Sequence, residues 1–68
     1  MINFKKAKAG LYIVTGHNRP KRILIEKDHQ GFWYYNDGFA ETPFLFTGTL
    51  YEAKFRIEQM CKADKCAG

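Results

Sequence analysis

Residues 49–53 constrain the fold of this chain most, because they have the pattern of a capped helix start. Thr49 is followed three residues later by Glu52, the spacing of a capping box. In that motif the threonine hydroxyl accepts from the Glu52 amide, while the Glu52 carboxylate accepts from the Thr49 amide. An apolar stripe of helical period follows, formed by Leu50, Ala53, Ile57, Met60 and Cys61. The pattern predicts one long helix over about residues 50–63.

Tyr51 and Phe55 do not belong to that stripe. At about 100° per residue, both side chains point well away from Leu50 and Ile57. Two explanations are open: a twisted sheet or the N-terminal segment covers them, or they form a second apolar strip for a protein partner. We favour the first, because a domain of 68 residues has little spare surface for large apolar side chains.

The sequence before the helix has the pattern of strands joined by tight turns. Three segments are rich in β-branched and aromatic residues, at positions 11–14, 21–27 and 32–35. The segments between and after them contain the Gly, Asn, Asp and Pro that are typical of turns, at positions 15–20, 28–31 and 36–38. We therefore expect a single α+β domain over residues 1–68, a three-stranded antiparallel meander with the helix packed on one face.

Two further segments leave alternatives open. Residues 1–9 form either a short arm or an edge strand, and their lysines suit an edge that must not aggregate. Residues 39–46 form either an ordered loop or a fourth strand at positions 44–46. Pro43 restricts such a strand to the edge of the sheet, because proline has no amide to donate to a neighbour.

The sequence argues against several classes of function. No apolar segment is long enough to cross a bilayer and no signal peptide is recognisable, so we expect a cytoplasmic protein without a membrane partner. The chain has no serine for a Ser-His-Asp triad and no glycine-rich phosphate-binding motif. Cys61 and Cys66 lack the spacing of a zinc knuckle, and Cys61 falls on the apolar stripe. We expect no enzyme, no metal and no cofactor, and no small-molecule substrate is evident.

The charge is distributed unevenly along the chain. Residues 1–27 carry seven basic side chains against one acidic, a net charge of +6. Residues 28–52 have a net charge of −4, and residues 53–68 of +2. Such asymmetry suggests a polyanionic partner, although a solvated surface without a partner explains it as well.

Four consecutive aromatic residues at positions 32–35 carry the functional argument. In a strand Phe32 and Tyr34 face one way, and Trp33 and Tyr35 face the other. A single helix covers only one of these faces, so one aromatic pair should remain on an open face and mark a binding surface. The alternative is that residues 39–46 or a second subunit cover that pair. The neighbours expected beside the open pair are Tyr12 and Arg22.

The segment Phe46-Thr47-Gly48-Thr49-Leu50-Tyr51-Glu52-Ala53-Lys54, following short strands, resembles the arm-site DNA-binding domains of phage-type tyrosine integrases. The resemblance covers about residues 11–62 and rests on a short motif. It implies a sheet whose open face enters the DNA major groove, around Arg19, Lys21, Arg22 and Trp33. The chain departs from that pattern in its unusually aromatic third strand and its longer, acidic residues 36–46. The layout also resembles small phage and prophage accessory proteins, including inhibitors of host enzymes.

Two hypotheses of function follow. The first is a small accessory protein that binds DNA or RNA, with lysines and arginines neutralising phosphates and aromatic rings stacking on bases. The second is a protein-interaction module, an inhibitor or a homodimer, that uses the same aromatic face as an apolar anchor and adds Tyr51 and Phe55. The residues assigned to nucleic-acid binding are Lys5, Lys6, Lys8, Tyr12, Arg19, Lys21, Arg22, Trp33 and Tyr35.

Overall fold

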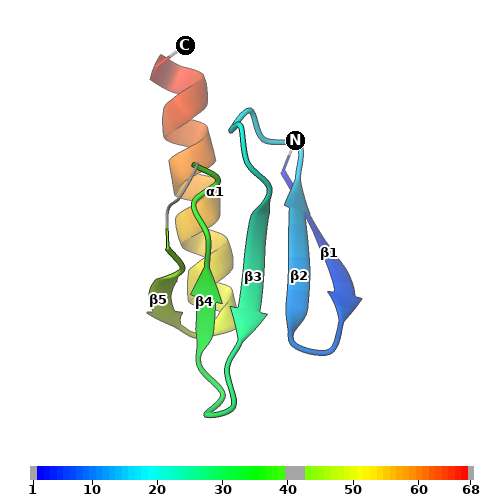
Figure 1. Ribbon diagram of the computed structural model, residues 1–68. Coiled ribbons are helices and arrows are strands. Elements are labelled where there is room, and N and C mark those ends of the chain that lie inside the picture. Colours follow the sequence, from blue (N-terminus) through cyan, green and yellow to red (C-terminus); the bar gives the residue numbers. More distant parts are fainter. Residues whose placement is uncertain (1, 40–42, 68) are drawn as a thin grey trace.

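A five-stranded antiparallel sheet and one helix make up the fold (Figure 1). The computed structural model describes residues 2–39 and 43–67, and the side chains as far as residue 63. The strands follow one another in the sheet in chain order, so the whole sheet is a meander. The elements are β1 (Asn3–Lys8), β2 (Leu11–Thr15), β3 (Ile23–Lys27), β4 (Trp33–Tyr35), β5 (Leu45–Gly48) and α1 (Leu50–Ala67).

The sheet has five strands, whereas the sequence predicts three, or four if residues 44–46 form a strand. β1 is an edge strand and pairs with β2, so the N-terminal segment is not an arm. The sequence does not identify β1 clearly as a strand, because its side chains are mostly exposed and include lysines, so apolar and polar residues do not alternate. Of the two alternatives for residues 39–46, of which 40–42 lie outside the described residues, the structure has the strand, β5, at Leu45–Gly48 rather than at 44–46. β5 forms the opposite edge of the sheet, as the position of Pro43 requires.

The predicted helix start is confirmed. The Glu52 amide donates to the Thr49 hydroxyl at 3.0 Å, and the Ala53 amide donates to the Thr49 carbonyl at 3.0 Å. Within the described part of the chain, the Glu52 carboxylate accepts from Arg56 rather than from the Thr49 amide. The helix continues to Ala67, four residues beyond the expected end, because nothing between residues 63 and 67 breaks it.

The core lies between α1 and one face of the sheet. Helix residues Ala53, Ile57 and Cys61 pack with sheet residues Val14, Ile23, Ile25 and Tyr35. Ile23, Ile25 and Ile57 have no exposed surface, and burying each of them contributes about 1.5–3 kcal/mol. Figure 1 shows α1 behind β4 and β5, while β1 and β2 extend to one side of it. Among the described residues, no helix lies on the opposite face of the sheet.

The register of β4 decides which aromatic side chains the helix covers. Tyr35 pairs with Ile25, and Trp33 pairs with Lys27, so both face the helix side. Tyr35 is only 5% exposed, and Trp33 lies against Tyr12 with ring centroids 5.8 Å apart. Of the two aromatic pairs that the sequence leaves open, Trp33 and Tyr35 therefore lie on the helix side, together with Tyr12, which pairs with Ile25. One face does stay open, but it carries Phe32 and Tyr34.

The loops at the end of the sheet away from the β3–β4 turn pack on each other through Gly38. The Lys21 amide donates to the Gly38 carbonyl at 2.8 Å, and Arg19 donates to the Asp37 carbonyl at 2.8 Å. Gly38 has a φ of 84°, and a Cβ there would lie 2.8 Å from Ile23 Cγ1. A side chain at this position is therefore unfavourable for two reasons: the backbone has a positive φ, and there is no space for a Cβ.

Gly38→Ala should destabilise the protein by about 2–4 kcal/mol, because the methyl group adds a clash with the core to the strain of a positive φ. Gly31→Ala is the matched control, since Gly31 has a φ of 95° but nothing within 4 Å of a Cβ. That control should cost only about 1–2 kcal/mol. Urea denaturation of the two variants measures the difference. Equal losses would contradict the close contact at Gly38.

Candidate functional site

Phe32, Tyr34, Phe44 and Phe46 form an aromatic patch on the open face of the sheet. Phe46 pairs with Tyr34 across β4 and β5, and its ring centroid lies 5.5 Å from those of Tyr34 and Phe32. Both ring pairs meet edge to face, the arrangement that aromatic side chains favour. Phe46 is nevertheless 60% exposed, and Phe32 and Phe44 are exposed as well. The patch is thus ordered by its own contacts and still open to solvent.

Asp28 fixes the β3–β4 turn beside this patch. Its Oδ1 accepts from the amides of Gln30 and Phe32, both at 2.9 Å, and its Oδ2 accepts from the Tyr34 hydroxyl at 2.9 Å. Desolvation acts to raise the pKa of Asp28, but the hydrogen bonds from Phe32, Tyr34 and Gln30 and the nearby His29 outweigh it and lower the pKa below 3.8. The same hydrogen bond raises the pKa of Tyr34. Asp28 therefore holds the Tyr34 ring in place as a carboxylate.

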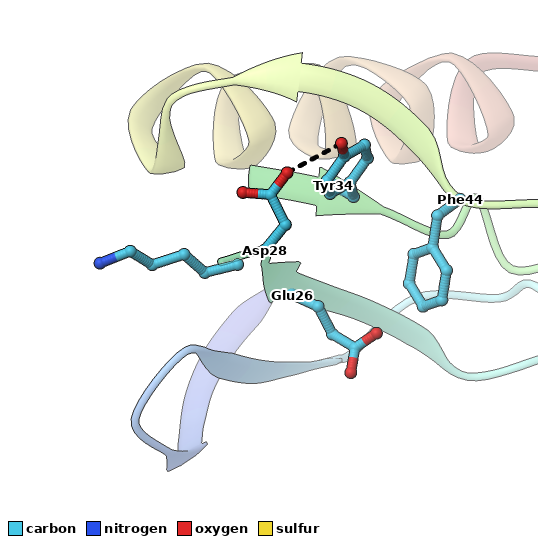
Figure 2. Close-up of a pocket in the computed structure, with 5 residues that line it drawn as sticks. Glu26, Asp28, Tyr34 and Phe44 are labelled. Atoms are coloured by element: carbon cyan, nitrogen blue, oxygen red, sulfur yellow. Dashed lines mark hydrogen bonds between the residues drawn. The ribbon is translucent and has the colours of Figure 1, made fainter. Parts of the chain in front are cut away.

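A hollow of about 370 Å³ lies between these groups (Figure 2). Its lining comes from the end of β3, the turn after it, β4 and the residue before β5. Figure 2 shows the Tyr34 hydroxyl joined to Asp28 by the dashed hydrogen bond, with Glu26 of β3 and Phe44, the residue before β5, nearby. The lining residues are Glu26, Lys27, Asp28, Tyr34 and Phe44.

The helix side of the sheet has a second feature, a lysine–aromatic flank where α1 leaves β1 and β2 uncovered. The Lys54 ammonium lies 5.1 Å from the Tyr12 ring centroid and 5.4 Å from that of Phe4. The Lys27 ammonium lies 5.9 Å from the Trp33 ring centroid. Tyr12 and Trp33 are half-buried, so the rings keep accessible surface. Lys6 belongs to the same side, because it pairs with Tyr12.

The structure separates the other basic residues assigned to nucleic-acid binding. Arg19, Lys21 and Arg22 lie between β2 and β3, at the end of the sheet opposite the β3–β4 turn (Figure 1). The Arg19 guanidinium is engaged, since it donates to Asp37 and stacks 4.4 Å above the Phe39 ring centroid. Lys5 and Lys8 lie on β1, at the far edge from the aromatic patch. Arg19, Lys21 and Arg22 therefore lie at the other end of the sheet from Trp33, which pairs with Lys27 near the β3–β4 turn.

Tyr51 and Phe55 are exposed on α1, so the expectation that other parts of the chain cover them is wrong. Tyr51 is 80% exposed and Phe55 51%. The N-terminal segment does not cover them, because it forms the edge strand β1 and pairs with β2. The two side chains lie on the side of the molecule remote from the aromatic patch, because Ala53 and Ile57 face the sheet.

Local patterns in the sequence mark some, but not all, of the residues that form these two surfaces. Phe32 and Tyr34 were recognised as one of two possible pairs, and the register chose between them. Phe46 was visible as an aromatic residue at an edge strand, but its face depends on the irregular pairing between β4 and β5. Nothing in the local sequence marks Lys27 and Lys54 as part of a site, because the rings that they contact, Trp33 and Tyr12, belong to other elements.

Within residues 2–39 and 43–63, no three His, Cys, Asp or Glu side chains come together as metal ligands. Cys61 is buried in the core. Among the described residues, no helix is long and apolar enough to span a membrane. No protein-family model, curated protein or solved structure matches the chain. The arrangement of its own side chains therefore carries the functional inference.

Protonation of Asp28 should weaken the fold. Because the folded-state pKa lies below 3.8, the contribution of Asp28 is complete above that value and is lost as the pH falls through the folded-state pKa. Asp28→Asn keeps the shape and an acceptor oxygen but not the charge. The wild type should be more stable than Asp28→Asn at neutral pH, and urea midpoints should converge as the pH falls below 3.8. A difference that does not change with pH would contradict the role of the carboxylate.

Proposed function

We propose that the chain is a protein-interaction module and that the aromatic patch on its open sheet face binds a partner polypeptide. The observation that carries this proposal is the exposure of Phe32, Phe44 and Phe46 side by side in a domain of 68 residues. A small protein has few apolar side chains to spare, and contiguous exposed rings on an ordered sheet usually mark an interface. Aromatic anchors of this kind supply most of the binding energy in many interfaces.

The charges around the patch favour a polypeptide over a nucleic acid at this face. Glu26 pairs with Tyr34 across β3 and β4, and Asp28 lies hydrogen-bonded to the same tyrosine. Two carboxylates next to the rings would repel phosphates. The basic residues between β2 and β3 lie at the other end of the sheet (Figure 1). The patch is therefore suited to an apolar partner segment with little negative charge.

Phe46→Ala should weaken binding of the partner about tenfold or more while leaving the fold intact, because its ring is exposed but central to the patch. Tyr51→Ala is the matched control, since it removes an exposed ring from α1 on the other side. Quantitative mass spectrometry of proteins retained from a cell lysate by each variant measures this. The proposal expects a protein retained by the wild type and Tyr51→Ala but lost with Phe46→Ala.

If no retained protein depends on Phe46, and sedimentation shows no self-association that depends on it, the open face is not an interface. Self-association lost in Phe46→Ala would identify the partner as a second copy of the chain. Loss with Tyr51→Ala alone would assign the interface to the helix instead. Each result separates the aromatic patch from the exposed strip of α1.

A second function is favoured by a different observation, the lysine–aromatic flank. Lys6, Lys27 and Lys54 border the accessible rings of Tyr12 and Trp33. The ion pair seen among the described residues joins Glu52 and Arg56 on α1 and involves none of these lysines. Bases stack on such rings while ammonium groups neutralise phosphates. We propose single-stranded nucleic acid as the ligand of this flank, with Tyr12 and Trp33 as the stacking residues.

Replacing both Lys27 and Lys54 with Gln should lower the affinity for single-stranded DNA or RNA and reduce the salt dependence, by about 0.7 in the log–log slope for each lost phosphate contact. Lys62→Gln is the control, because Lys62 is exposed on α1 away from the rings. Fluorescence anisotropy at two salt concentrations measures affinity, and quenching of Trp33 reports stacking. Absence of binding at low salt would eliminate this function. It would also be eliminated if the double replacement of Lys27 and Lys54 lowered the affinity no more than Lys62→Gln.

A further inference from the structure

The hollow beside the aromatic patch has walls of two different kinds. The rings of Tyr34 and Phe44 provide apolar faces from β4 and from the residue before β5. Glu26 and Asp28 provide carboxylates from β3 and the turn after it. Figure 2 shows these four side chains around one space, with the Tyr34–Asp28 hydrogen bond holding one ring and one carboxylate together. Its volume of about 370 Å³ is enough for the end of one long side chain.

The hollow is locally negative although the chain has a net charge of +4. Lys27 contributes to the lining, but its ammonium lies 5.9 Å from the Trp33 ring centroid, on the helix side of the sheet. Glu26 is exposed, and within the described part of the chain its carboxylate has no cationic side chain in ion-pair distance. The hollow therefore presents one available carboxylate, a second carboxylate held by the turn, and two aromatic rings.

This combination suits a planar organic cation better than a metal ion or a compact ammonium. Metal ions such as Ca²⁺ and Mg²⁺ require several oxygen ligands, whereas Asp28 already accepts three hydrogen bonds. An arginine guanidinium is weakly hydrated, stacks on aromatic faces and donates two parallel hydrogen bonds to a carboxylate. Tyr34 and Phe44 offer the faces, and Glu26 offers the carboxylate.

We propose that the hollow binds the guanidinium of an arginine side chain from the partner polypeptide. This inference rests on the proposed protein interaction and specifies its chemistry. Phe32 and Phe46 extend the apolar surface next to the hollow, since Phe46 contacts Tyr34. The partner segment therefore carries an arginine close to an apolar residue that lies on the patch.

The test is a titration of the ¹⁵N-labelled protein with N-acetyl-arginine amide, followed by amide chemical shifts. N-acetyl-citrulline amide is the matched control ligand, because it has nearly the same shape without the charge. The expected result is saturable shifts at Glu26, Tyr34 and Phe44 with the arginine derivative and at least about tenfold weaker binding of the citrulline derivative. Equal shifts with the two ligands, or equal affinity for N-acetyl-lysine amide, would overturn the assignment to a guanidinium.

Glu26→Gln should reduce the affinity for the arginine derivative about tenfold, and Glu58→Gln on the exposed side of α1 should not change it. Amide spectra of both variants confirm that the fold is retained. Unchanged affinity in Glu26→Gln would overturn the site. Phe46→Ala separates the two proposals: it should abolish retention of the partner protein but preserve binding of the arginine derivative, whose site does not include Phe46. Loss of that binding would overturn the hollow as a separate guanidinium site.

Discussion

The fold depends on the packing of one helix against one face of a five-stranded sheet. Ile57 and Ala53 meet Ile23 and Ile25 in a core without exposed surface. The chain has no second helix among its described elements to cover the other face. Antiparallel sheets tolerate one solvated face, which then usually carries polar side chains. Here that face carries exposed phenylalanines at its β4–β5 end, and this departure is the basis of the proposed interface.

The two faces of the sheet have different chemistry because β4 places its aromatic side chains on alternate sides. Tyr35 is part of the core, and Trp33 lies against Tyr12 of β2. The Lys27 ammonium lies over the Trp33 ring, and the Lys54 ammonium lies over the Tyr12 ring. Tyr34 lies on the other side, with its hydroxyl bound to Asp28 and its ring against Phe46. A one-residue change in register would exchange these sets. The same short strand therefore contributes to the core, to a basic flank and to an acidic, aromatic hollow.

Local chemistry in the sequence predicted the parts of the fold that depend on near neighbours. The Thr49–Glu52 spacing located the helix start, and the turn residues located the meander. The limit set by Pro43 was also correct, because it follows from the missing amide alone. β1 was ambiguous, since its exposed lysines have no apolar alternation.

The candidate site depended on contacts distant in sequence, which local patterns do not encode. Whether Tyr34 or Tyr35 is buried is decided by the pairing with Ile25, and the sequence left both choices open. Arg19 looked available for phosphate, but the turn at residues 36–39 folds back and engages its guanidinium. Asp28 looked like an ordinary turn residue, although its carboxylate organises the turn and reaches Tyr34. In each case the deciding partner lies on another strand or loop.

The central claim is that an isolated chain leaves Phe46 open to water while it buries Tyr35, and hydroxyl-radical footprinting of the monomer tests this most directly. Sedimentation at the same concentration establishes that the protein is monomeric, and mass spectrometry measures oxidation of each residue. We expect rapid oxidation of Phe46 and Phe32 and strong protection of Tyr35. Protection of Phe46 in the monomer, or oxidation of Tyr35 as fast as that of Phe46, would contradict the account.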